Sequence, residues 1–111
     1  MLNTRITYLY TDAANYKTSN VAVIPGILTS EQQAQILDSL DEGEFFVPHA
    51  VGLPEDRGGF APDPDLDHGW FRLSPGFAEP TDADATVDVV PNMLTAAFVR
   101  TGPNGWDRYL R

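Results

Sequence analysis

Alternating carboxylates stand out in one stretch of the chain, Asp63-Pro64-Asp65-Leu66-Asp67-His68-Gly69. Loops that wrap oxygen atoms around calcium space their carboxylates in this way. The stretch departs from the first half of an EF-hand loop because His68 replaces the tight-turn glycine and Ser74 stands where a bidentate glutamate is needed. A small divalent-metal-binding domain or a metal-assisted hydrolase is therefore one hypothesis, and a solvated acidic loop explains the same pattern. The metal ligands would be Asp63, Asp65, Asp67 and His68.

The two histidines, His49 and His68, are the other candidates for chemistry, as acid–base groups or as ligands of a transition metal. They lie nineteen positions apart, so no helical spacing aligns them in advance. A partly buried histidine bonded to a carboxylate or a backbone carbonyl explains each of them equally well. The sequence contains no cysteine, no Gly-x-Ser-x-Gly elbow and no phosphate-binding glycine loop. These absences favour a non-catalytic protein without a cofactor.

Acidic residues are concentrated in the middle of the chain. The whole sequence carries sixteen Asp and Glu against seven Lys and Arg, which gives a net charge of −9. Between residues 38 and 88 there are thirteen acids and two arginines, whereas the rest of the chain has a small positive excess. Such a charge repels the phosphates of DNA and RNA, so direct binding to nucleic acid is not expected.

This acidic middle has two interpretations. Carboxylates on a solvated face keep a small protein soluble. They also form a docking surface for a basic protein partner, whose approach their electric field accelerates. We predict the second role, that of a binding or regulatory protein, and an inhibitor that imitates nucleic acid is one form of it. The predicted surface consists of Glu55, Asp56, Asp63, Asp65, Asp67, Asp82 and Asp84.

The elements that must position these residues follow from the spacing of apolar side chains. Runs of β-forming residues bounded by turn signals predict strands over 5–10, 21–24, 44–48 and 70–73. Apolar residues at helical spacing predict a helix over 30–41, after a capping box of Thr29 and Gln32. A second helix is predicted from 89–91 to Gly102-Pro103, and residues 11–20 and 50–67 are predicted to be loops.

The predicted fold class is α+β, with a three- to four-stranded, mainly antiparallel sheet and two helices packed on one face. The 111 residues suit a single domain over 1–111, and the tail from Asn104 to Arg111 carries enough apolar surface to dock on it.

No apolar run approaches the ~18 residues of a membrane span, and the first residues lack an apolar signal core. We therefore expect a cytoplasmic protein, either a monomer or a small homo-oligomer.

Aromatic, acidic, amide and basic side chains gather after the first predicted strand, in the run from Tyr8 to Lys17. Here the sequence resembles a set of small acidic bacterial proteins in which a strand is followed by Asp-Ala-x-Asn-Tyr-Lys. The resemblance continues through a capped helix to Val51-Gly52-Leu53-Pro54 and to Asp67-His68-Gly69-Trp70. It implies a common fold and no activity, because no function is established for that set. A binding cleft is the functional alternative, lined by Tyr10, Asp12, Asn15, Tyr16, Lys17, His68 and Trp70.

Overall fold

A long hairpin forms the centre of the fold. The computed structural model describes residues 2–11, 17–56 and 70–109. Strands β1 (Asn3–Thr11) and β2 (Lys17–Ile24) run antiparallel from the Thr4–Ile24 pair to the Thr11–Lys17 pair. The first predicted strand is confirmed. The second begins earlier than predicted, because cross-strand pairing holds the polar residues 17–20 in a ladder although their turn propensity predicted a loop.

The other edge of β1 is shared by two short strands. β4 (Phe71–Arg72) pairs with Leu9–Tyr10, and β5 (Ala78–Thr81) pairs with residues 3–6. β3 (Phe45–Phe46) pairs with the free side of β4. The described residues thus form a five-stranded antiparallel sheet, one strand more than the sequence predicted. β5 was missed because Ala-Glu-Pro-Thr lacks a strand pattern, and Pro80 is tolerated there because β5 lies at an edge.

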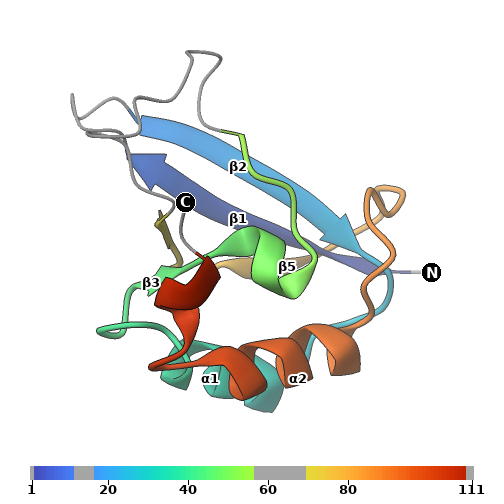
Figure 1. The fold of residues 1–111 in the computed structure, drawn as a ribbon. Helices are drawn as coiled ribbons and strands as arrows, with labels where there is room; N and C mark the ends of the chain where they lie inside the picture. The colour runs from blue at the N-terminus through green and yellow to red at the C-terminus, as the bar shows by residue number, and fades with distance from the viewer. Residues whose placement is uncertain (1, 12–16, 57–69, 110–111) are drawn as a thin grey trace.

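Both predicted helices are present and lie together on one face of the sheet (Figure 1). α1 (Ser30–Asp38) begins with the predicted capping box, in which the Gln32 amide donates to Thr29 Oγ1 at 3.1 Å. It ends three residues earlier than predicted, and the chain then turns through Glu42 and Gly43, both at positive φ, into β3. α2 (Pro91–Thr101) has Pro91 in its first turn, as predicted. The α+β fold class is therefore confirmed.

The core lies between the sheet and the helices and is rich in aromatic rings. Phe46 contacts Phe98 of α2 with ring centroids 5.4 Å apart, and Phe98 contacts Trp106 at 5.3 Å. Trp106 belongs to the short 3-10 helix η2 (Trp106–Tyr109) and is fully buried, with Nε1 donating to Ser39 O at 2.7 Å. The predicted docking of the tail is confirmed for this residue. Among the described residues, no helix is both long and apolar enough to cross a membrane.

Candidate functional site

A turn of 3-10 helix between α1 and β4 forms one wall of the candidate site. This element, η1 (Pro48–Val51), begins with a proline and ends at Gly52, whose φ of 87° lies in the left-handed region that favours glycine. The Leu53 amide then donates to the Pro48 carbonyl at 3.0 Å. These local features explain why part of the segment predicted to be an irregular loop has a fixed shape.

Side chains from the hairpin hold this wall in place. The Asn20 side chain forms two hydrogen bonds with the backbone of Asp56, accepting from its amide at 2.7 Å and donating to its carbonyl at 2.9 Å. The Tyr8 hydroxyl donates to the Pro54 carbonyl. Burial and, to a lesser extent, the charge of Glu55 raise the pKa of Tyr8 well above its usual 10.0. The segment after η1 is therefore fixed to the helix-facing side of the sheet.

At the surface, a contact between His49 and Glu55 joins the two ends of the same segment. Glu55 Oε2 accepts from the His49 amide at 2.9 Å and lies 2.6 Å from His49 Nδ1. A carboxylate in this position orients the imidazole ring, which is one of the two explanations that the sequence offered for this histidine. The pair braces the turn from His49 to Glu55, and thereby the wall that η1 provides.

A groove with a volume of about 510 Å³ lies between η1 and α2. Its η1 side consists of residues 50–52, and its α2 side is lined by Val89, Met93, Ala96 and Ala97. Val51 and Ala97 are buried, whereas the Met93 side chain is 61% exposed. The groove is therefore open, mostly apolar and bordered by a flexible side chain that adapts well to varied partners.

Two opposite charges mark the ends of this α2–η1 groove. Asp88 lies just before α2, and Arg100 lies in its last turn. Both side chains are exposed, and within the described part of the chain neither forms an ion pair. Their order also complements the dipole of α2, whose N-terminus is positive and whose C-terminus is negative. The groove is thus electrically polar along its length.

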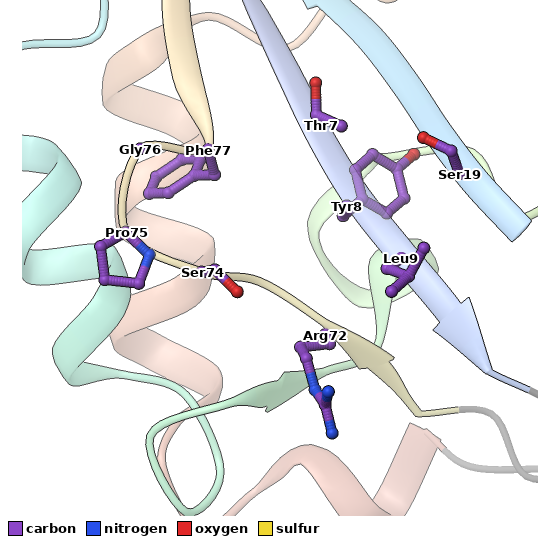
Figure 2. A pocket seen from close by; sticks show the side chains of 9 residues that line it. All are labelled: Thr7, Tyr8, Leu9, Ser19, Arg72, Ser74, Pro75, Gly76 and Phe77. Carbon is purple, nitrogen blue, oxygen red and sulfur yellow. The ribbon is translucent and has the colours of Figure 1, made fainter. Parts of the chain in front are cut away.

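A second hollow, of about 260 Å³, lies on the opposite face of the sheet, where residues 73–77 separate β4 from β5 (Figure 2). Thr7, Ser19 and Ser74 contribute hydroxyl groups to its lining. Figure 2 shows the Arg72 side chain extending away from Thr7 and Ser19. Its Nε lies 3.5 Å from Glu44 Oε1. This hollow is smaller than the groove, and its one cation is already paired.

The described acids of the predicted docking surface lie in two segments. Glu55 bonds to His49, and the backbone of Asp56 bonds to Asn20. Asp82 and Asp84 are exposed in the connection from β5 to α2, which Asn3 holds by donating to Ala83 O at 2.9 Å. The other three predicted members, Asp63, Asp65 and Asp67, lie outside the described residues. So does the whole predicted metal site, and the described residues contain no group of His, Asp and Glu suited to a metal ion.

Three members of the predicted cleft are described. Tyr10 is buried in the core, with its ring centroid 5.0 Å from that of Phe71. Trp70 is partly buried and contacts Phe45, with centroids 6.1 Å apart, while Lys17 is exposed at the start of β2. The remaining members lie outside the described residues: Asp12, Asn15, Tyr16 and His68.

Sequence reasoning missed the groove, although α2 carried a signal. Its apolar residues cover more than the face that contacts the core, since Met93 remains exposed while Leu94 and Phe98 are buried. Apolar residues on a second face indicate a further contact.

A comparison of the chain with protein-family models, curated proteins and solved structures finds no match.

Proposed function

We propose that this protein is a non-catalytic binding module that seats the apolar side of a basic segment from a protein partner in the α2–η1 groove. The observation that supports this function best is the groove itself, an open apolar hollow of about 510 Å³ beside an exposed methionine. Exposed apolar area of this kind, bordered by polar residues, is typical of protein interaction sites.

Burial of the groove supplies the attraction. Covering Met93, which is 61% exposed, contributes roughly 1 to 2 kcal/mol at the usual value per unit of apolar area. Neighbouring apolar residues extend the contact, since Ile27 and Val90 are also exposed and line a smaller hollow at the start of α2. The centre of the interface is therefore apolar, as in most specific protein interfaces.

Charge selects a basic partner. The net charge is −9, and the exposed Asp82, Asp84 and Asp88 lie in the segment that leads into the groove. No ion pair joins these three residues to any other part of the described chain. Their field attracts Lys and Arg side chains and accelerates the encounter with a basic surface.

Site-specific photo-crosslinking in cells tests this function. One variant carries a photoreactive amino acid in place of Met93, and the matched control carries it in place of Val99, which is 52% exposed on the same helix but does not line the groove. We expect the first variant to form an adduct with a partner whose crosslinked segment is basic and apolar, and the control to form little of it.

Three results would count against the proposal. One is equal adduct formation at positions 93 and 99, and another is an adduct of position 93 with an acidic segment. The third is an adduct between two copies of this chain, which would assign the groove to self-association.

With the partner purified, we expect the affinity to fall steeply between about 0.05 and 0.5 M salt, because exposed charges are screened over that range. Salt-independent binding would remove the electrostatic part of the argument.

A further inference from the structure

We infer that the α2–η1 groove fixes the direction of the segment it binds, by accepting an amphipathic helix that runs antiparallel to α2. The bound helix is basic overall: the one acidic residue in its first turn lies at Arg100, and the basic residues of its last turn lie at Asp88. This inference rests on the proposed function and deepens it by naming the chemistry of the partner segment.

The walls of the groove favour a helix over an extended strand. They consist of two helical elements, α2 and η1, whose backbone donors and acceptors are largely used within those elements. An extended segment would find no row of open backbone groups there. Along α2 the lining positions 93, 96, 97 and 100 recur at helical spacing, and three small residues, Gly52, Ala96 and Ala97, allow a second helix to approach closely.

The charges at the two ends set the direction. Arg100 lies nine residues beyond Pro91, so about 14 Å of helix separates it from the start of α2, which Asp88 precedes by three residues. A helix of three to four turns placed alongside would bring one end to Asp88 and the other to Arg100. Ion pairing then requires a basic group near Asp88 and an acidic group near Arg100.

Helix dipoles support the same direction. In an antiparallel arrangement the positive N-terminus of the partner helix lies at the negative C-terminus of α2, and the reverse holds at the other end. An acidic first turn and a basic last turn also stabilise the partner helix by itself. Side-chain charges, the two dipoles and the stability of the bound helix therefore agree on one direction.

Two synthetic peptides of identical composition and apolar pattern test the inference by calorimetric titration of the full chain. Both peptides are basic overall: the acidic-first peptide has one Glu in its first turn and several Lys in its last, and the basic-first peptide has these charges exchanged. We expect the chain to bind the acidic-first peptide roughly five- to tenfold more tightly at low salt. In the double variant Asp88→Lys and Arg100→Glu, which has the same net charge, this preference is expected to shrink or reverse.

The matched control exchanges charges on the other face of the protein. Arg5 and Glu79 form an ion pair at 2.8 Å there, so the double variant Arg5→Glu and Glu79→Arg keeps the pair, its location and the net charge. It is expected to keep the preference of the unmodified chain. The control thus separates the charges of the groove from the charge of the molecule as a whole.

Each remaining outcome decides the question. Equal binding of the two peptides, or tighter binding of the basic-first peptide, overturns the direction but leaves the proposed function in place. A preference of undiminished size after the Asp88 and Arg100 exchange also overturns it, because the helicity of the peptide would then explain the whole difference. Binding of neither peptide overturns the direction, and if no basic adduct forms at position 93 either, the proposed function is overturned as well.

Discussion

The two faces of this molecule use their few cations differently. On the outer face of the sheet, Arg5 pairs with Glu79 at 2.8 Å, and Arg72 lies 3.5 Å from Glu44 and over the ring of Phe45. At the helix face, Arg100 has no carboxylate partner among the described residues. Two arginines on the sheet face are thus paired with carboxylates, whereas the charge of Arg100 at the groove stays available to another molecule.

This contrast indicates which charges of a strongly acidic protein are free to contact another molecule. Exposed ion pairs contribute little to the free energy of unfolding, so the pairs on the sheet act mainly by weakening the field around them. Net charge alone therefore does not locate a binding surface. Unpaired charge beside exposed apolar area is a better guide, and the two coincide at the α2–η1 groove.

The largest expected effect concerns the core that supports α2. Trp106→Ala removes the fully buried ring that contacts Phe98 and lowers the free energy of unfolding by about 3 to 5 kcal/mol. Val21→Ala, at an exposed position on the outer face, changes it by no more than about 0.5 kcal/mol. Urea unfolding followed by circular dichroism measures both. Similar losses in the two variants would contradict the contrast between the faces.

The next effect concerns the wall of the groove. Asn20→Ala removes both hydrogen bonds to the backbone of Asp56 and lowers the free energy of unfolding by roughly 1 to 3 kcal/mol. Ser19→Ala, the neighbouring position on the outer face, is expected to have little effect. Hydrogen exchange measured by mass spectrometry should show faster exchange around η1 in the Asn20 variant. Unchanged exchange there would mean that other contacts hold the wall.

A smaller effect appears at high pH. Because the folded protein holds the proton of Tyr8 more tightly than the unfolded chain does, the stability that this group contributes is complete below pH 10.0. It falls as the pH rises further, by at most about 1.4 kcal/mol per pH unit. Unfolding titrations between about pH 8 and 11 measure this slope. Tyr8→Phe should show a shallower slope, and the same slope in both proteins would refute the assignment to Tyr8.

The smallest effect is expected on the sheet face. Glu79→Gln breaks the exposed pair with Arg5 and changes the free energy of unfolding by about 0.5 kcal/mol or less. Because this pair lies far from the groove in the fold, peptide binding should keep its affinity at moderate salt. A loss of several kcal/mol in stability would show that the outer face depends on its ion pairs.

The parts of the fold that sequence predicted are those with local causes. The capping box of Thr29 and Gln32 and the alternation of Ile6, Tyr8 and Tyr10 are visible within a few residues, and both are confirmed. β5 and the first half of β2 have no such pattern and exist because β1 pairs with them. Nonlocal pairing therefore decided the strands that local propensity could not show.

The candidate site was harder to predict for the same reason. Its walls, residues 50–52 and the α2 positions from Met93 to Arg100, are distant in sequence and meet only when both pack on the core. The acidic charge is visible in the sequence, but acids are densest in residues 38–88 and not at the groove. The packing of α2 beside η1 and the lack of ion pairs at Asp88 and Arg100 arise only in the folded structure. Neither can be read from the composition of the chain.

The position of β1 has a consequence for synthesis on the ribosome. β1 can pair with β2 as soon as the hairpin has left the exit tunnel. Its other edge is fully paired only after residues 78–81 have been synthesised. The contact from Asn3 to Ala83 spans 80 positions. During that interval the nascent chain exposes an unpaired strand edge and aromatic side chains that are buried in the folded protein. Binding of a chaperone would protect the chain most at this stage.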